Sequence, residues 1–287
     1  MKERKTGLVI CGNSGVDYYT LDYPTEVIHS FLHLNEELYE DFVDITAEEF
    51  YQRLIDEPNI DVKTSQPPTG YILEVYEQMK SEGYTEALVI SISSQLSGTY
   101  HGAVLASEMI EDFPVRVVDS KSVSYGQLYL GIRAIDLIKE GKDLETIAKS
   151  VEALIPNINT LVYVDTLKYL VKNGRLSSTR GALGTLLKIK PILRLTQEDG
   201  KLIPYEKIRT SKRAIARILE IFKEETEGKI AEVYIIYTNN KDFALEVKER
   251  ILEIRPTFNV ELVPLTPVVG AHAGPGTLGV GYIFQDE

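Results

Sequence analysis

The sequence of 287 residues contains no tryptophan and a single cysteine, Cys11. One cysteine excludes an intramolecular disulfide framework and is typical of a protein from a reducing compartment. No run of 18 apolar residues is present, so the sequence predicts no membrane span. The apolar run near the basic N-terminus covers residues 8–11 and is too short for a secretory signal. We therefore expect a cytoplasmic protein without stable membrane insertion.

The signatures of several enzyme classes are also missing. The sequence has no Walker lysine motif for ATP, no GxSxG nucleophile elbow, no HExxH and no CxxC. Residues 274–279 match GxGxxG, but only eight residues follow them, whereas a dinucleotide fingerprint needs a helix and a distant acidic residue. His29 and His33 have no cysteine or carboxylate at metal-ligand spacing. We expect no metal site and no cofactor.

Charge is distributed unevenly along the chain. The net charge is −12, and residues 1–155 carry 12 basic against 27 acidic side chains. Residues 168–217 instead carry 13 basic and 3 acidic side chains. The acidic first half argues against nucleic-acid wrapping. The basic stretch indicates either a solvated surface or contact with an anion or an acidic partner. It includes Lys168, Lys172, Arg175, Arg180, Lys188, Lys190, Arg194, Lys207, Arg209, Lys212, Arg213 and Arg217.

Apolar runs and helix signals alternate in the first half. Thr46 and Glu49 form a capping box at a helix start, and Pro67-Pro68 open a second helix. Strands joined by helices of this length are typical of crossover units and a parallel sheet. We expect strands at residues 7–11, 27–34, 87–92 and 115–118, and helices from 46, over 67–82, from 97, over 127–139 and over 144–154.

The second half has a different rhythm, which predicts a mixed sheet with helices. Asp199-Gly200 indicates the tip of a hairpin. The overall prediction is an α/β fold with an N-terminal parallel-sheet domain over residues 1–156 and a C-terminal mixed-sheet domain over 157–287. We expect strands at 161–164, 191–195, 202–208, 233–237, 260–263 and 278–284, and helices at 167–171, 212–223 and 243–254.

Hydroxyl side chains form three clusters at or near predicted strand ends and helix starts. Residues 64–65 precede a helix, residues 91–94 and 97–99 follow a strand and open a helix, and residue 120 follows a strand. Ligands bind outside the carboxyl ends of parallel strands, and free amides at helix starts favour a carboxylate or phosphate. An anion pocket is therefore one interpretation; the other is that Thr64 and Ser97 are only helix caps. His272 lies among small residues, so we expect it on an unshielded loop, where contact with a ligand is favoured over a plain turn position. An unperturbed ring there would titrate near neutral pH.

In this order, the clusters resemble the DegV family of bacterial fatty-acid-binding proteins over nearly the whole chain. The family's opening aspartate-serine signature is altered here to Cys11-Gly12-Asn13-Ser14. The matching motifs are Lys63-Thr64-Ser65-Gln66-Pro67, Ser93-Ser94-Gln95-Leu96-Ser97-Gly98-Thr99-Tyr100, Val118-Asp119-Ser120, Tyr169-Leu170 with Gly174-Arg175, Lys190-Pro191-Ile192-Leu193, and Ala271-His272-Ala273-Gly274-Pro275-Gly276-Thr277.

The resemblance implies a lipid-binding protein, not itself an enzyme, with one long-chain fatty acid between its two domains. It also implies a separate kinase subunit, related to dihydroxyacetone kinases, that supplies ATP and makes an acyl phosphate, with Arg209 contacting that subunit. The absence of an ATP motif agrees with this division of work. The resemblance places the carboxylate at Thr64, Ser94, Ser97 and His272, near Ser65, Gly98 and Arg175.

Two other interpretations remain open at this stage. The chain could be a stand-alone acyl hydrolase or transferase that uses a pair such as Ser97 and His272. It could also be a regulatory or DNA-associated module that uses the basic stretch, although no helix-turn-helix signature is recognised. Arg209 could instead form only a surface ion pair with Glu206, without any part in the function.

Overall fold

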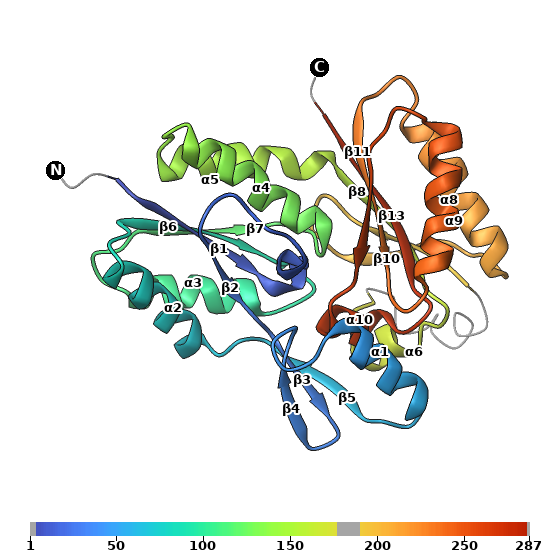
Figure 1. The fold of residues 1–287 in the computed structure, drawn as a ribbon, viewed down its shortest axis with the longest axis horizontal. Helices are drawn as coiled ribbons and strands as arrows, with labels where there is room; N and C mark the ends of the chain where they lie inside the picture. Colours follow the sequence, from blue (N-terminus) through green and yellow to red (C-terminus); the bar gives the residue numbers. More distant parts are fainter. Residues whose placement is uncertain (1–3, 177–189, 286–287) are drawn as a thin grey trace.

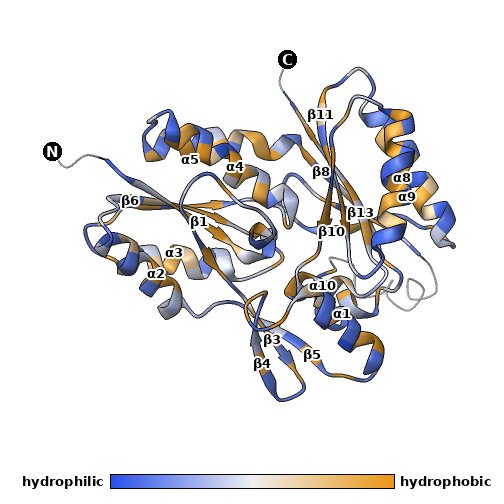
Figure 2. Ribbon diagram, viewed as in Figure 1, coloured by the Kyte–Doolittle hydropathy of each residue, from blue (hydrophilic) through white to orange (hydrophobic). Residues whose placement is uncertain are grey.

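The computed structural model describes residues 4–176 and 190–285, and two main β-sheets form its framework (Figure 1). Helices cover the sheets, and the strands are mostly apolar whereas the helices carry both apolar and hydrophilic faces (Figure 2). This arrangement confirms the predicted α/β fold with one parallel and one mixed sheet. The division of the chain at residue 156 stays a prediction.

The first sheet is parallel, with the order β2-β1-β6-β7. On strand β1, Leu8 and Ile10 pack against one pair of helices, on one face of the sheet. Val9 packs against a second pair of helices, on the other face. Burial on both faces explains the unbroken apolar runs. The strands are β1 (Thr6–Cys11), β2 (Thr25–Ile28), β6 (Glu86–Ser91) and β7 (Val115–Asp119); the first pair of helices is α4 (Tyr125–Lys139) and α5 (Leu144–Leu154), and the second is α2 (Thr69–Ser81) and α3 (Thr99–Met109).

The second sheet is mixed, with the order β10-β9-β8-β13-β11-β12. All of its neighbouring strands run antiparallel except the last pair. Two helices, α8 (Ser211–Glu225) and α9 (Lys241–Ile254), pack on one face. The strands are β8 (Ile158–Tyr163), β9 (Ile192–Leu195), β10 (Leu202–Glu206), β11 (Ala231–Tyr237), β12 (Val260–Pro264) and β13 (Leu278–Phe284), and the short 3-10 helix η3 (Ile155–Asn157) leads into β8.

A glycine in β13 allows an aromatic ring to lie against the strand. A Cβ at Gly281 would fall 1.9 Å from the Tyr234 ring of the neighbouring strand β11. The Tyr234 hydroxyl lies 2.7 Å from Thr160 Oγ1 on β8. Gly281 of β13 therefore lets the large Tyr234 side chain fill the face of the mixed sheet that is turned toward the N-terminal half.

A third sheet of three short antiparallel strands was not predicted. Its order is β4-β3-β5, with β3 (Phe31–Leu34), β4 (Glu37–Glu40) and β5 (Val62–Ser65). The expected single strand over residues 27–34 is wrong, because the chain leaves the parallel sheet at His29-Ser30 and then pairs with β5. His29 and His33 consequently do not share one strand face.

This small sheet packs with helix α1 (Ala47–Asp56) against α10 (Pro267–Ala273) near the other end of the chain. The predicted capping box at the start of α1 is confirmed, since Thr46 Oγ1 accepts from the Glu49 amide and the Glu49 carboxylate accepts from the Thr46 amide. Tyr51 of α1 donates a hydrogen bond of 3.0 Å to the Leu265 carbonyl. Residues 31–65 therefore bridge toward the C-terminal half of the protein.

Candidate functional site

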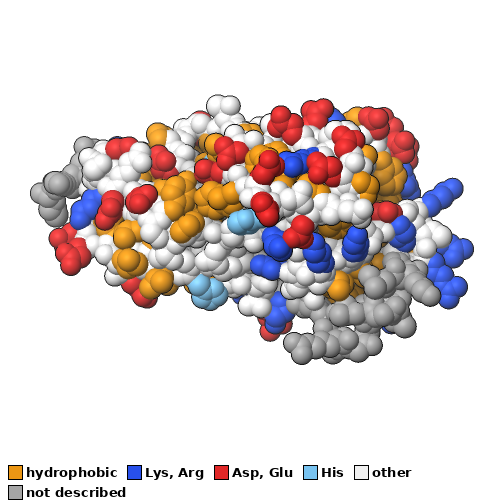
Figure 3. All heavy atoms as spheres, turned by 90° about the horizontal axis from the view of Figure 1, so that it is seen from below, with side chains coloured by type: hydrophobic (Ala, Val, Ile, Leu, Met, Phe, Trp, Pro, Cys, Tyr) orange, Lys and Arg blue, Asp and Glu red, His pale blue; other side chains and the backbone are white. Residues whose placement is uncertain are grey.

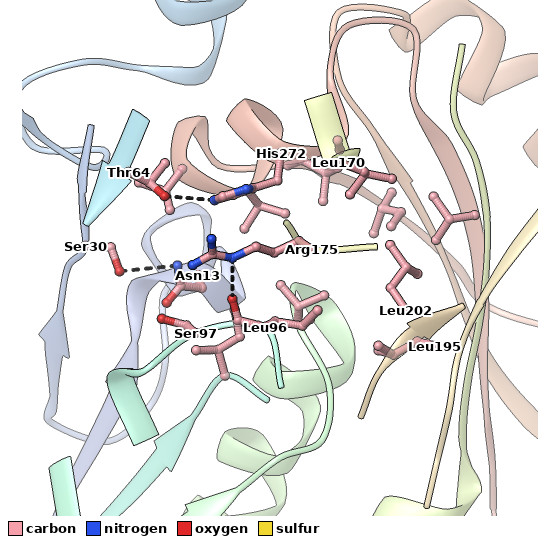
Figure 4. Close-up of a pocket in the computed structure, with 18 of the residues that line it drawn as sticks. Asn13, Ser30, Thr64, Leu96, Ser97, Leu170, Arg175, Leu195, Leu202 and His272 are labelled. Atoms are coloured by element: carbon pink, nitrogen blue, oxygen red, sulfur yellow. Dashed lines mark hydrogen bonds between the residues drawn. The ribbon is translucent and has the colours of Figure 1, made fainter. Parts of the chain in front are cut away.

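A pocket lies between the two main sheets, and its lining changes character from one end to the other (Figure 4). Its volume, with the open mouth included, is about 960 Å³. One end is polar and the other end is apolar. The polar end contains Asn13, Ser30, Thr64, Ser97, Arg175 and His272.

The polar end is assembled where strands of the N-terminal half finish. Asn13 belongs to the short 3-10 helix η1 (Gly12–Ser14) after β1, and Ser30 follows β2. Thr64 and Ser65 end β5, and Ser97 and Gly98 follow β6. Thr64 and Ser97 belong to two of the hydroxyl clusters that the sequence pattern predicts to bind an anion, and the structure brings both into one pocket.

Thr64 and His272 form the closest side-chain pair at this end. The Thr64 Oγ1 lies 2.8 Å from the His272 Nε2, although the two residues are 208 positions apart. The His272 Nδ1 is buried and has no hydrogen-bond partner among the described residues. Burial and the nearby charge of Arg175 lower the pKa of His272 from 6.5 to about 4. His272 is therefore neutral at physiological pH, because its surroundings shift its pKa away from the near-neutral value of an unperturbed ring.

The structure also corrects the expected loop around His272. This residue lies in the last turn of α10, a helix that begins after Thr266 with Pro267 in its first turn and ends at Gly274. Proline is tolerated at the first helical positions, and Gly274 has a φ of 82°, so both ends suit their residues. The small residues serve packing, because a Cβ at Gly270 would fall 2.0 Å from the Tyr51 hydroxyl oxygen.

The two serines after β6 differ in their positions. Ser97 lines the pocket, and its Oγ lies 2.8 Å from Thr99 Oγ1 and accepts a bond of 3.3 Å from the Thr99 amide. Ser94 is not among the lining residues; its backbone amide donates to Asp119 Oδ1 at 3.1 Å. Gly98 allows close contact with Gln66, since a Cβ at that glycine would fall 1.9 Å from the Gln66 Oε1. The His272 Nε2 contacts Thr64 and its Nδ1 has no partner among the described residues, so Ser97 and His272 do not form a hydrogen-bonded pair.

Arg175 brings a permanent positive charge to the polar end. Its Nε donates to the Leu96 carbonyl at 3.2 Å, and its Nη1 donates to the Asn173 carbonyl at 2.6 Å. It forms no ion pair with any residue in the ranges 4–176 and 190–285. An arginine held by backbone carbonyls, with donors left over, can bind a carboxylate or phosphate directly.

Asn13 and Ser30 are lining residues that the sequence analysis missed. Both are buried, and they follow the adjacent strands β1 and β2 of the parallel sheet. The rule that identified the other strand ends could have found them, because both residues follow parallel strands. Ser65, which was expected near the site, is exposed, lines the pocket and lies 3.1 Å from His33 Nε2 through its Oγ.

The far end of the pocket is apolar. Leu170, Leu195 and Leu202 lie opposite the polar group in Figure 4. Leu170 belongs to the short helix α6 (Lys168–Lys172), and the other two leucines belong to the hairpin of β9 and β10. Val162 and Ile236 of the mixed sheet complete this apolar lining.

Arg209 lies apart from these residues. It is exposed and directly precedes Thr210, the N-cap of α8, as the sequence predicted. The alternative pairing with Glu206 is wrong, since Glu206 pairs with Arg217 at 3.1 Å. Other members of the basic stretch also have acidic partners, and Arg180 and Lys188 lie outside the described residues; those partners are Asp61 for Lys172, Asp165 for Lys190 and Glu225 for Arg194.

Two kinds of feature are absent from the described part of the chain. No helix within residues 4–176 or 190–285 is both long and apolar enough to cross a membrane. No group of three or more His, Cys, Asp or Glu side chains in the same ranges could hold a metal ion.

Comparison with known proteins gives consistent results. A model of the family described as "Uncharacterised protein, DegV family" matches residues 19–285. A DegV domain-containing protein of Halalkalibacterium halodurans is 34% identical over 251 residues, which cover 87% of this chain and 88% of that protein. The structure of a fatty acid binding DegV family protein from Streptococcus agalactiae has a TM-score of 0.89 at 27% identity and covers 99% of this chain and 100% of its own. DegV of Bacillus subtilis, described as a fatty acid binding protein, has a TM-score of 0.88 at 29% identity, with the same coverage.

Proposed function

The chain belongs to the DegV family, and on this premise we propose that it binds one long-chain fatty acid in the pocket between its sheets. The observation that carries the proposal is the division of that pocket into a polar end with one fixed positive charge and an apolar end (Figure 4). A fatty acid has the matching two-part chemistry. The proteins of similar structure from Streptococcus agalactiae and Bacillus subtilis are described as fatty acid binding.

The head group is assigned to the polar end. Thr64, Ser97 and His272 supply uncharged hydrogen-bonding groups, and Arg175 supplies the opposite charge. Between the two serines that the sequence left unranked, we assign the carboxylate contact to Ser97, because Ser97 lines the pocket and Ser94 does not. A hydrogen bond to a charged group contributes about 1.5–3 kcal/mol, so several such contacts fix the orientation of the acid.

The tail is assigned to the apolar end and supplies most of the affinity. Each buried CH₂ group contributes about 0.8 kcal/mol, so a chain of roughly 16 carbons has a large driving force even after the cost of ordering it. Leu170, Leu195 and Leu202 form the surface against which this chain packs.

We further propose that the chain works in the cytoplasm and presents the acid to a separate ATP-binding kinase subunit for acyl-phosphate formation. The sequence contains no Walker motif, so ATP would come from the partner. Lys and Arg side chains gather in the right half of the face that Figure 3 shows. Arg209 is exposed without an ion pair to any described residue, and we assign it to the contact with that subunit.

The alternative of a stand-alone hydrolase has no observation in its favour. A serine nucleophile needs a base within hydrogen-bond reach. The His272 Nε2 contacts Thr64 instead of Ser97, and a histidine with a pKa of about 4 is a weak base. We therefore propose no second function.

Mass spectrometry of an organic extract of the purified protein tests the binding proposal. We expect about one equivalent of a long-chain fatty acid, and uptake of such an acid after delipidation. Leu202→Glu places a charge in the apolar end and should abolish uptake, whereas Leu245→Glu, on an exposed leucine of α9, should not. A parent protein that neither carries nor takes up fatty acid contradicts the proposal.

The kinase proposal has a separate test. The delipidated protein is loaded with fatty acid and mixed with ATP and a dihydroxyacetone-kinase-like subunit from the same organism. We expect acyl phosphate only in the complete mixture, and Arg209→Ala should keep fatty-acid occupancy while strongly reducing product. Equal loss of occupancy and product would make Arg209 a binding or folding determinant instead.

A further inference from the structure

Thr160 of β8 places a hydroxyl group in the wall of the apolar end. The residue lines the pocket and is 4% exposed. In the antiparallel pairing of β8 with β9, it stands directly opposite Leu195, so the two side chains lie on the same face of the sheet. Leu195 lies opposite the polar group in Figure 4. Thr160 therefore belongs to the part of the pocket assigned to the tail of the fatty acid, away from its head group.

A tyrosine reaches this hydroxyl group across a glycine. The strand register places Thr160, Gly281 and Tyr234 in one row over β8, β13 and β11. Because Gly281 has no side chain, the Tyr234 ring lies over it, and the Tyr234 hydroxyl oxygen comes to 2.7 Å from Thr160 Oγ1. The row thus builds a pair of hydroxyl groups into a wall whose neighbouring residues, Val162 and Ile236, are apolar.

This pair of hydroxyl groups leaves one proton without an acceptor. Each hydroxyl group has one proton to donate, and the contact between the two groups uses only one of them. Neither group has a further hydrogen-bond partner among the described residues. When Tyr234 donates, the unused proton is that of Thr160, the member that lines the pocket. Thr277, another lining threonine, differs because its hydroxyl group donates to the Gly274 carbonyl at 2.9 Å.

A second hydroxyl group with unused capacity lies beside Tyr234. The Ser122 Oγ is buried and has no hydrogen-bond partner in the part of the chain that the structure describes. A Cβ at Gly126 would fall 2.4 Å from this oxygen and 3.0 Å from the Tyr234 hydroxyl oxygen, so both hydroxyl groups flank the same point. The next residue, Val123, lines the pocket. Unused hydrogen-bonding capacity is therefore concentrated around one part of the wall.

We propose that the apolar end is a second polar subsite, which accepts a long-chain fatty acid carrying one hydroxyl group in the distal half of its chain, with Thr160 as the residue that contacts it. The ligand hydroxyl accepts the unused proton of the pair and can donate its own proton to a free lone pair of the same two oxygens. This inference rests on the proposed fatty-acid binding and specifies a class of acid by its tail.

The physical reason is the cost of a hydrogen-bonding group that stays unpaired in an apolar wall. A chain of CH₂ groups covers the Thr160 hydroxyl without pairing it, whereas a hydroxyl group on the chain pairs it. In a wall that is entirely apolar, the same ligand hydroxyl would lose its bonds to water and would weaken binding. The two kinds of wall therefore predict opposite orders of affinity for hydroxylated and plain acids.

The experiment compares octadecanoic acid with isomers of hydroxyoctadecanoic acid whose hydroxyl group is stepped along the distal half of the chain. Titration of the delipidated parent protein needs no variant: at least one distal isomer should bind as tightly as octadecanoic acid or more tightly. Thr160→Val should weaken binding of that isomer by roughly tenfold and change octadecanoic acid by less than about threefold. Thr160→Ser keeps a hydroxyl group and should retain the affinity of the parent for both lipids to within about threefold. An isomer with its hydroxyl group beside the carboxyl group is the matched control and should respond to Thr160→Val as octadecanoic acid does.

Three outcomes would overturn the inference. A parent protein that binds octadecanoic acid but binds every distal isomer more weakly has a purely apolar tail site, and the proposed function then still stands. An unchanged affinity of every distal isomer in Thr160→Val makes the hydroxyl pair a part of the wall only, and an equal loss for all lipids makes Thr160 a packing residue. A parent protein that binds no fatty acid at all would instead contradict the proposed function itself.

Discussion

His29 is buried and His272 is partly buried, and their surroundings have opposite charge. The His29 Nε2 lies 2.9 Å from Asp17 Oδ1, and its Nδ1 lies 3.5 Å from Glu40 Oε1. Burial alone lowers the pKa of His29, but the bond to Asp17 and the neighbouring carboxylates outweigh it and raise the pKa. His272 faces Arg175 and keeps an unpartnered Nδ1. A histidine whose counter-charges come from the protein itself serves structure, whereas a polar cluster that lacks a counter-charge is suited to a ligand.

The two clusters are linked through α10. Asp41, beside His29, accepts a hydrogen bond of 3.0 Å from the backbone amide of Val268 in the first turn of that helix. His272 occupies the last turn of the same helix. The carboxyl group of Asp41 therefore fixes the beginning of the helix that carries the pocket histidine, His272.

The largest expected effect in this comparison comes from the Asp41 carboxyl group. Burial raises the pKa of Asp41 from 3.8 to about 7, even though hydrogen bonds from Val268 and Thr266 act against the rise. A group with a raised folded-state pKa contributes stability below its unfolded pKa and loses it as pH rises through the folded value. Between pH 3.8 and about 7, this group should therefore lower the free energy of unfolding by up to about 4 kcal/mol.

Asp41→Asn keeps the shape and removes the titration. Urea denaturation at about pH 5 and pH 8.5 should show the variant gaining stability relative to the parent at the higher pH. Asp242→Asn, on an exposed aspartate in the first turn of α9, serves as the control and should show no such gain. A difference between parent and Asp41→Asn that is the same at both pH values would refute the assignment.

His272 should give the opposite pH dependence with a smaller size. Its pKa is lowered from 6.5 to about 4 in the folded chain, chiefly by burial and then by Arg175. A group with a depressed folded-state pKa contributes stability above its unfolded pKa and loses it as pH falls through the folded value. Delipidated parent protein should therefore lose up to about 3 kcal/mol from this group between pH 6.5 and 4.

His272→Gln separates this contribution from general acid denaturation. The variant retains a hydrogen-bonding side chain, but it has no group that must be protonated on acidification. Its free energy of unfolding should decline less steeply than that of the parent from pH 6.5 to pH 4. Parallel curves for the two proteins would show that His272 does not titrate as its surroundings indicate.

Thr64 gives the next effect, on binding. Thr64→Val removes the hydroxyl group that contacts His272 and, in the proposed complex, the carboxylate, while it preserves the shape of the side chain. Loss of a hydrogen bond to a charged group should weaken fatty-acid binding by roughly ten- to a hundredfold. Thr257→Val, on an exposed threonine far from the pocket lining, is the control. Equal affinities for the parent and Thr64→Val would place the carboxylate elsewhere.

Parts of the fold were predictable because local signals decide them. The apolar run of β6 and the capping box of α1 indicate these elements directly, and Ser97 reaches the pocket after the parallel strand β6, as the strand-end rule requires. The hairpin of β9 and β10 followed from Asp199-Gly200, where Gly200 has a φ of 71° that suits glycine.

Other parts depend on contacts that a local pattern does not contain. Strands β3, β4 and β5 have only four residues each, and β3 alone alternates clearly in burial. Strands β3 and β5 pack against α10, more than 200 positions away. The helix α10 was not predicted, because glycines such as Gly270 and Gly274 are typical of a loop. In the structure, Gly270 lies within the helix and makes room for Tyr51. For the same reason, the partner of His272 and the protonation state of its ring could not be predicted from sequence.

The smallest effect distinguishes two serines within the ligand cluster. The Ser97 Oγ already accepts from the Thr99 amide, so its O–H remains free to donate either to Thr99 Oγ1 or to a bound carboxylate. Ser94 supplies a backbone amide to Asp119, and that contact survives removal of its side-chain hydroxyl. Ser97→Ala should therefore weaken fatty-acid binding by roughly three- to tenfold, and Ser94→Ala by less than about twofold. Titration of both delipidated variants with hexadecanoic acid measures the difference. A larger loss for Ser94→Ala would reverse the assignment and move the head group toward the start of the loop after β6.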